Sequence, residues 1–262
     1  MQTEKDRERS EVIYNKLAPV YDHIMKDVDY EDWTDYIDGI IQYHHPFGNR
    51  VLELACGTGT MALAMEKRDD YDITATDVSA EMIRMARQKG KRRKSHITWM
   101  VQDMCRLNVD KVFDIIYMVF DSLNYLHTKE QIFSVLRGVS DHLADDGIFI
   151  FDFTTPNYSP KIAPLLDGEH NAHRNYLYTR SSTYDRKNGI HTNHFVVEKK
   201  DPVSGRSIDR FEEIHKQRIW SFQEIKIMIM QSNLRILAAY EDFDFSDASD
   251  NSDRITMVLC LE

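Results

Sequence analysis

The stretch from Arg50 to Thr60, Arg-Val-Leu-Glu-Leu-Ala-Cys-Gly-Thr-Gly-Thr, constrains the fold more than any other part of the chain. Its apolar beginning predicts a buried strand, Gly57 and Gly59 predict a tight turn, and Met61–Glu66 favours a helix. Glycine adopts main-chain angles that a Cβ forbids, and it lets a ligand approach the bare N–H groups at a helix start. This order predicts an α/β fold that binds a nucleoside-bearing ligand above the carboxyl end of the strand.

Two carboxylates near this turn indicate which ligand it holds. Glu53 lies inside the predicted strand, and Asp77 ends a second strand-like run over residues 72–77. An acid at the tip of the second strand can accept hydrogen bonds from both ribose hydroxyls, each contributing about 1.5–3 kcal/mol. Gly57–Ala62 also fits the glycine pattern of dinucleotide sites, but Glu53 would repel a pyrophosphate and attract a cationic ligand end. S-adenosylmethionine, which carries an amino group and a sulfonium, therefore fits better than NAD.

Four stretches, taken in their order along the chain, resemble the motifs of class I S-adenosylmethionine-dependent methyltransferases. They are Glu53-Leu-Ala-Cys-Gly-Thr-Gly59, Asp77-Val-Ser, Asp103-Met and Phe113-Asp-Ile-Ile-Tyr. Two further stretches are similar to a bacterial subgroup of small-molecule enzymes, which in turn resembles amino-sugar and glycine-type N-methyltransferases. These are the segment Tyr14–Asp22 with Trp33, and Phe120-Asp-Ser-Leu-Asn-Tyr-Leu126. The resemblance covers roughly Tyr14 to the C-terminus.

The resemblance implies a Rossmann-like α/β fold with a mostly parallel seven-stranded sheet in the order 3-2-1-4-5-7-6. Apolar residues at helical spacing predict a helical cap over residues 1–45, ahead of the S-adenosylmethionine-binding domain formed by 46–156 and 219–262. Three segments of alternating polarity, near 174–184, 190–199 and 207–220, are joined by the turn sequences 186–189 and 201–205. They predict an antiparallel β lobe inserted over 157–218, placed over the cofactor crevice as a substrate lid.

Local signals place several further elements. Ser79 should cap a helix that continues to about Lys89, and Asp145–Gly147 should turn the chain into a strand over 148–153. Ser221–Glu224 has the form of a capping box, which predicts that a helix begins there.

The resemblance also implies a cofactor-binding set. Glu53 would hold the methionine amino end, Gly57 and Gly59 would admit the methionine chain, and Asp77 would bind the ribose. Asp103 and Met104 would bind adenine, although Asp103 is equally suited to cap the turn that follows it. Tyr14 and Tyr21 would close the site, whereas composition alone favours simple packing of their helix. The full predicted set is Tyr14, Tyr21, Trp33, Glu53, Ala55, Cys56, Gly57, Gly59, Asp77, Val78, Met82, Asp103, Met104 and Phe120.

Methyl transfer from a sulfonium is an in-line displacement, so the main task of the protein is to align donor and acceptor, which can lower the barrier by as much as ~7–11 kcal/mol. A base is needed only if the acceptor arrives protonated. Candidates for orienting or deprotonating the acceptor are Tyr125, Tyr14 and His215, and we expect Asp121 and Asn124 beside the donor methyl group. Asp121-Ser-Leu-Asn is not the N/D-P-P-Y motif of some amine methyltransferases, and Tyr125 stands where the amino-sugar enzymes have histidine. An amine acceptor is therefore one possibility among several.

Composition restricts the partners. A formal net charge of −10 argues against a broad nucleic-acid surface, and the basic run Lys89–Lys94 fits a solvated helix end. Three cysteines indicate a reducing compartment, no apolar run approaches the ~20 residues of a membrane span, and the histidines lack zinc-type spacing. We expect a cytoplasmic monomer or homodimer that acts on a small molecule and holds no metal. The alternatives are an NAD(P)-dependent oxidoreductase, a catalytically silent binding module, and an RNA or protein methyltransferase.

Overall fold

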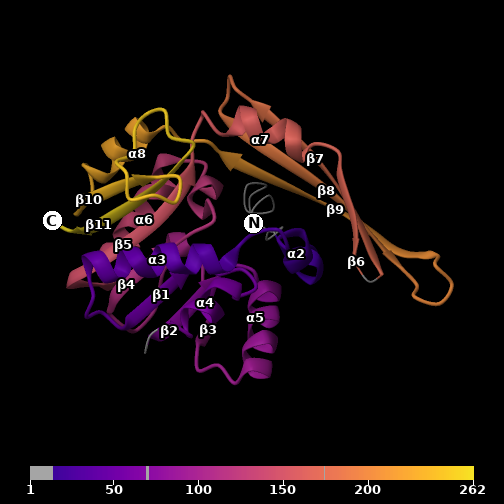
Figure 1. Ribbon diagram of the computed structural model, residues 1–262, viewed down its shortest axis with the longest axis horizontal. Coiled ribbons are helices and arrows are strands. Elements are labelled where there is room, and N and C mark those ends of the chain that lie inside the picture. Colours follow the sequence, from indigo (N-terminus) through magenta and orange to yellow (C-terminus); the bar gives the residue numbers. More distant parts are fainter. Residues whose placement is uncertain (1–13, 69–70, 174) are drawn as a thin grey trace, which may run out of the picture.

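A seven-stranded sheet forms the centre of the computed structural model, which describes residues 14–68, 71–173 and 175–262 (Figure 1). Its strands are β1 (Arg50–Leu54), β2 (Asp72–Asp77), β3 (Thr98–Val101), β4 (Phe113–Met118), β5 (Leu143–Thr154), β10 (Leu234–Glu241) and β11 (Arg254–Leu261). They lie in the order β10-β11-β5-β4-β1-β2-β3, and all neighbours are parallel except β5–β11 and β10–β11. Because β10 and β11 are the sixth and seventh core strands, the predicted order 3-2-1-4-5-7-6 is confirmed.

Helices cover both faces of this sheet. They are α3 (Tyr30–His44), α4 (Thr60–Met65), α5 (Ala80–Arg93), α6 (Lys129–His142) and α8 (Phe222–Ile229), with the short 3₁₀ turns η1 (Met104–Arg106) and η2 (Ser122–Tyr125). Leu52 and Phe149 pack with α6 and α8 on one face, while Val51 and Ile148 pack with α3, α4 and α5 on the other. Burial of both faces explains why the strands have nearly continuous apolar sequences.

The predicted helix starts are correct. The Ser79 hydroxyl accepts a hydrogen bond from the Met82 N–H at 3.2 Å, and Ser221 with Glu224 forms the capping box of α8. Helix α5 continues beyond the predicted end at Lys89 as far as Arg93. Lys89 is not simply solvated, because its ammonium group lies 2.9 Å from the carboxylate of Asp22.

The predicted turn at Asp145–Gly147 is part of β5 instead. Phe113 pairs with Leu143 and Ile115 pairs with Ile148, so β5 accommodates the extra residues as an irregularity in its pairing with β4. A bulge of this kind inserts residues into a strand without ending it. The polar Asp-Asp-Gly sequence therefore marks a bulged strand rather than a connection.

The segment between β5 and α8 forms a separate four-stranded antiparallel sheet, which we call the lobe. It consists of β6 (Glu169–His173), β7 (Tyr176–Asp185), β8 (Ile190–Lys200) and β9 (Ser207–Arg218), in that order, preceded by α7 (Ser159–Leu166). The strands β7, β8 and β9 and both hairpin turns agree with the sequence prediction, but β6 and α7 were missed. The polar sequence of β6 lacks apolar alternation, and Pro160 and Pro164 argue against a helix.

The described part of the predicted cap consists of α2 (Ala18–Ile24) and α3, while residues 1–13 lie outside the described residues. Pro19 lies in the first turn of α2 and so begins that helix, where its missing N–H is not needed. Leu17 and Val20 pack against Phe195 and Val197 of the lobe. Helix α2 therefore lies against the lobe, and it also contacts α5 of the central domain (Figure 1).

No described helix is long and apolar enough to cross a membrane. Within the same residues, no group of three or more His, Cys, Asp or Glu side chains is arranged to hold a metal ion.

Candidate functional site

The turn after β1 contains three residues with positive φ angles. Ala55 has φ 55°, and Gly57 and Gly59 have φ 53° and 74°. A Cβ built on Gly57 would have the Tyr21 ring, 3.8 Å away, as its nearest neighbour, so the main chain here faces open space. A Cβ on Gly59 would lie 2.4 Å from the Trp99 ring. Gly57 thus leaves room for a ligand, whereas Gly59 is required for packing.

A small cavity of about 100 Å³ lies over this turn, and we call it the donor cavity. The residues of the predicted cofactor set that line it are Tyr14, Tyr21, Glu53, Ala55, Cys56, Gly57, Asp77, Val78, Met82, Met104 and Phe120. The predicted residues Trp33, Gly59 and Asp103 lie outside its lining. The sequence analysis missed Tyr30, Thr58, Thr60, Met61 and Ser122. Of these, the two threonines could have been predicted, because they lie in the glycine turn.

Glu53 is a buried acid at the floor of the donor cavity, with 2% of its surface exposed. Its Oε2 accepts a hydrogen bond from the Tyr117 hydroxyl at 3.0 Å. Burial raises the pKa of Glu53 to about 8, and this hydrogen bond only partly opposes the effect. Because its partner is uncharged, the carboxylate provides a suitable site for the cationic end of a ligand.

Asp77 is oriented by two main-chain donors. Its Oδ2 accepts from the Gly57 N–H and its Oδ1 accepts from the Ser79 N–H, each at 2.8 Å. Burial raises the pKa of Asp77, while both hydrogen bonds act in the opposite direction. Each carboxylate oxygen keeps a lone pair, so the fixed group can still accept from two adjacent hydroxyls.

Asp103 lies at the start of η1, where its Oδ1 accepts from the Cys105 N–H at 2.9 Å. This is the capping role that the sequence analysis left open, and contact of Asp103 with adenine stays a prediction. Met104, the next residue, lines the donor cavity together with Met82.

A larger cavity of about 950 Å³ adjoins the first, and we call it the acceptor cavity. It is lined by the cap, the carboxyl ends of β4 and β5, α7, the lobe, the segment after β10 and the start of β11. The two cavities share four lining residues, Tyr14, Tyr21, Phe120 and Tyr125. The Tyr14 and Tyr125 hydroxyls are hydrogen-bonded to each other, and Trp33, which lines only the acceptor cavity, packs on Phe120 with ring centroids 4.4 Å apart.

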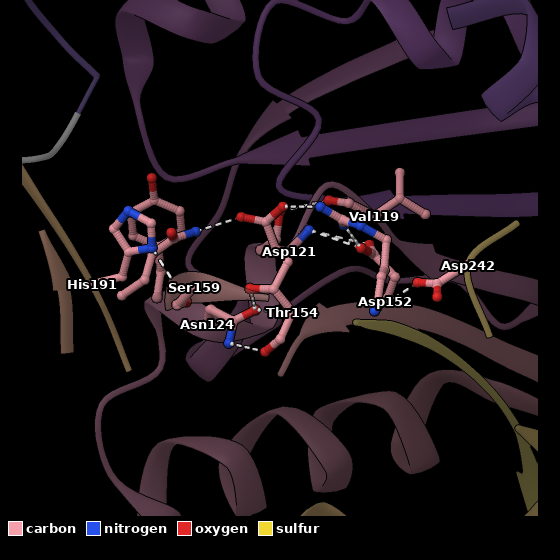
Figure 2. A network of polar contacts seen from close by, with 12 residues as sticks. Val119, Asp121, Asn124, Asp152, Thr154, Ser159, His191 and Asp242 are labelled. Carbon is pink, nitrogen blue, oxygen red and sulfur yellow. Dashed lines mark hydrogen bonds and ion pairs between the residues drawn. The ribbon is translucent and has the colours of Figure 1, made fainter. Parts of the chain in front are cut away.

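A network of charged groups fixes the end of β4 (Figure 2). Phe120 and Asp121 both have left-handed angles, φ 61° and 50°, which are unfavourable for residues with a Cβ. The Asp121 N–H donates to Asp152 at 3.1 Å, and the guanidinium of Arg254 bridges Asp152 and Asp121, the latter at 2.9 Å. The side-chain amide of Gln217, from the lobe, donates to the other oxygen of Asp121.

Asn124 is not beside the reacting groups as the sequence suggested. It is fully buried and lines neither cavity. Its side-chain amide donates to the Thr154 and Arg218 carbonyls at 3.2 and 2.9 Å, and its oxygen accepts from the Thr154 N–H at 3.0 Å. Asn124 therefore anchors η2, the turn that carries Tyr125, to β5 and the lobe (Figure 2).

The lobe brings His215 to the shared wall. His215 is 1% exposed, and its ring centroid lies 4.2 Å from that of Tyr14 and 6.2 Å from that of Tyr125. The structure thus brings the three predicted catalytic candidates together. Glu213, on the same face of β9, accepts from the Leu17 N–H at 2.8 Å and from the Tyr14 N–H, which ties the cap to the lobe.

Several residues of the acceptor cavity were missed by the sequence analysis. They are Arg180, Asn193, Gln217 and Arg254, which come from four different strands. Cross-strand register alone brings the lobe residues together, since Ser182 pairs with Asn193 and Asn193 pairs with His215. From the sequence alone, the alternation of side chains along each strand shows only that half of the lobe residues can face the cavity.

Residues 51–147 match the family described as Methyltransferase domain. The putative methyltransferase YqeM of Bacillus subtilis is 30% identical over 249 residues, which are 93% of this chain and 95% of that protein. The dTDP-3-amino-3,4,6-trideoxy-alpha-D-glucopyranose N,N-dimethyltransferase of Streptomyces venezuelae is 24% identical, covering 84% of this chain and 90% of that enzyme. Among solved structures, an S-adenosylmethionine-dependent methyltransferase from Clostridium acetobutylicum superposes with a TM-score of 0.78 at 26% identity, over 95% of this chain and 98% of the other.

Proposed function

Since the chain belongs to the class I S-adenosylmethionine-dependent methyltransferases, we propose that it transfers the methyl group to an amine of a small molecule held in the acceptor cavity. The observation that carries this proposal is the wall shared by the two cavities, where an acceptor can meet the donor. A cavity of about 950 Å³ is of the size that encloses a small molecule. The enzyme from Streptomyces venezuelae is named for methylation of an amino group, which supports nitrogen as the acceptor atom.

The residues of the donor cavity fit the cofactor. Glu53 offers a buried carboxylate without a charged partner in its hydrogen bond, Gly57 leaves open space, and Asp77 presents two oriented oxygens. We assign the methionine amino end to Glu53, the methionine chain to Gly57, the ribose to Asp77, and one wall of the adenine site to Met82 and Met104. The bound cofactor supplies an electrophilic methyl group that needs no activation by the protein.

The chain's own residues orient the acceptor and accept its proton. Burial raises the pKa values of Tyr14 and Tyr125 above the ordinary range of a phenol, so both remain neutral hydroxyls at physiological pH. They can hold an amine by hydrogen bonds but cannot deprotonate it. His215 lines the same wall, and neither of its ring nitrogens forms a hydrogen bond among the described residues, although Nε2 lies 3.4 Å from the Glu213 carboxylate. We assign it as the base that receives the proton of an acceptor ammonium.

The Tyr125→Phe variant should lower kcat by about 3–10-fold, because it removes one orienting hydrogen bond worth about 0.5–1.5 kcal/mol. Affinity for S-adenosylhomocysteine should not change. Steady-state rates and calorimetry measure the two quantities, and Tyr43→Phe, at an exposed site on α3, is the matched control. Unchanged turnover on the true acceptor would remove Tyr125 from the chemical step.

Affinity for S-adenosylhomocysteine should rise by about 10-fold between pH 6 and pH 8 and then level off. The carboxyl of Glu53, with its pKa raised to about 8, is mostly protonated below that pH, and a bound ammonium favours its ionised form. Binding must therefore release a proton, which calorimetry in buffers of different ionisation enthalpy detects. In a Glu53→Gln variant, any titration of the ligand itself remains but that of residue 53 is lost. The pH dependence of affinity should therefore differ between the variant and the wild type. Identical pH dependence in both proteins would exclude this role for Glu53.

The proposed function is tested by incubating the protein with methyl-labelled S-adenosylmethionine and a fractionated bacterial metabolite extract. A labelled small molecule carrying the methyl group on nitrogen supports it. Label confined to RNA or protein, or on oxygen or carbon only, contradicts it. Binding of NAD(H) without binding of S-adenosylhomocysteine would contradict the cofactor assignment as well.

We also propose a function for each part of the chain. Residues 1–45 act as a cap over the donor, 46–156 with 219–262 bind it, and 157–218 form the lid of the acceptor cavity. Cys56 and Cys260 are free thiols in the described part of the chain, which suits a reducing compartment such as the cytoplasm.

A further inference from the structure

The acceptor cavity has an aromatic half. Trp33 and Tyr36 of α3 pack around Phe243, with ring centroids 4.3 and 5.3 Å from it, and Phe120 and Phe245 extend the same surface. All five rings line the cavity, yet Phe243 and Phe245 remain 43% and 47% exposed. Large apolar rings left exposed inside a cavity indicate a ligand with a flat apolar surface.

The opposite half, on the lobe, carries polar atoms without partners. Among the described residues, the Nε of Arg180, the Oδ1 of Asn193 and the Nδ1 of His215 are buried and form no hydrogen bond. The Nε2 of His215 also forms none, but it lies 3.4 Å from a carboxylate oxygen of Glu213. All three side chains line the cavity and lie on adjacent strands, with Asn193 directly opposite His215. Together they present a donor, an acceptor and an imidazole, which are the groups that a hydroxyl and an amine can satisfy.

The charge of the cavity is unfavourable for phosphate. The described arginines that line it are both neutralised, Arg180 by Glu169, and Arg254 by Asp121 and Asp152. Three further carboxylates at the start of α3 line the same cavity: Asp29 and Asp32 are exposed, whereas Asp35 is paired with Arg68 at 2.8 Å. An anion entering past these groups meets like charge, whereas a protonated amine is attracted.

We propose that the acceptor is an unphosphorylated amine with an aromatic body and a hydroxyl group, and that nucleotide-linked amino sugars are excluded. This inference rests on the proposed function, because it names the class of amine that the same cavity takes. The ring lies against the aromatic half, the hydroxyl meets Arg180 and Asn193, and the amine reaches the wall shared with the donor cavity.

Calorimetry in the presence of S-adenosylhomocysteine tests the inference without turnover. The probes are tyramine, 2-phenylethylamine, O-phosphotyramine and a dTDP-linked amino sugar. We expect tyramine to bind at least ~10-fold more tightly than O-phosphotyramine and the dTDP sugar, and ~3–10-fold more tightly than 2-phenylethylamine. The Asn193→Leu variant should abolish the preference for tyramine over 2-phenylethylamine while leaving affinity for S-adenosylhomocysteine unchanged.

Two charge variants distinguish the effect of a charge beside the cavity from the effect of the net charge of the protein. Asp32→Lys should weaken tyramine binding and improve O-phosphotyramine binding, each by ~3–10-fold, whereas Asp145→Lys, on the exposed bulge of β5, should alter neither. Tighter binding of a phosphorylated probe, or no binding of any aromatic amine, overturns the inference. If a labelled methyl group nevertheless reaches the nitrogen of the dTDP sugar, the proposed function stands and only the inference fails. If label appears on oxygen alone, the proposed function itself fails.

Discussion

Replacing Arg254 by methionine should lower the free energy of unfolding by about 3–5 kcal/mol, since it leaves a buried carboxylate without its counterion. Asp152 is fully buried, and its carboxylate pairs with Arg254 and also accepts a hydrogen bond from the N–H of Asp121. Two consecutive residues with left-handed angles, Phe120 and Asp121, depend on this arrangement. We therefore expect the variant to lose both stability and the shape of the acceptor cavity.

Urea unfolding of the wild type and the variant measures the difference. Burial raises the pKa of Asp152 even with Arg254 present, and removal of the cation should raise it further. Protonation then relieves the buried charge, so the stability deficit should be smaller at pH 5 than at pH 8. Arg235→Met, at an exposed position on the neighbouring strand β10, is the matched control and should change stability by less than about 0.5 kcal/mol. A deficit for Arg254→Met no larger than that of the control would show that the ion pairs contribute little.

Asp77→Asn should reduce affinity for S-adenosylhomocysteine by at least about 100-fold. Two hydrogen bonds from ribose hydroxyls to a charged oxygen contribute about 1.5–3 kcal/mol each, and an amide replaces one of the two accepting oxygens with a donor. That donor would also face the N–H of Gly57 or Ser79, both of which now donate to the carboxylate. The loss of affinity thus combines weaker sugar binding with a disturbed glycine turn.

Calorimetry with S-adenosylhomocysteine and with adenosine measures this loss, and thermal unfolding reports damage to the turn. Asp72→Asn, at the exposed opposite end of the same strand, removes an equal charge and should leave affinity unchanged. If adenosine and 2′,3′-dideoxyadenosine lose affinity equally in the Asp77 variant, the carboxylate does not bind the ribose. The contribution of the turn would then account for the whole effect.

The parts of the fold that sequence predicted correctly are encoded by neighbouring residues. The glycine turn after β1, the Ser79 cap and the Ser221–Glu224 capping box each need only a few consecutive residues. The strand order followed from the resemblance, because no local pattern specifies which strands pair. The four-residue pattern of a cap survives in any tertiary context, whereas β6, with its polar sequence, is a strand only because it pairs with β7.

The parts that the sequence did not predict depend on residues far apart in the chain. Asp121, Asp152 and Arg254 are separated by 31 and 102 residues, so no spacing rule connects them. Asn124 was expected beside the donor because it follows a strand end, but packing turned its side chain toward Thr154 and away from both cavities. Likewise, the two possible roles of Asp103 differ only in side-chain direction, which the sequence leaves undetermined.

The contact between Gly59 and Trp99 changes how mutations in the glycine motif should be understood. Trp99 belongs to β3 at the outer edge of the sheet, and an added methyl group would also lie 3.0 Å from Ala86 of α5. An alanine at this position would push β3 and α5 away from β1, whether or not a nucleoside is bound. Loss of activity in such a mutant would report a displaced sheet edge, so only Gly57 can serve to examine how the backbone admits the cofactor.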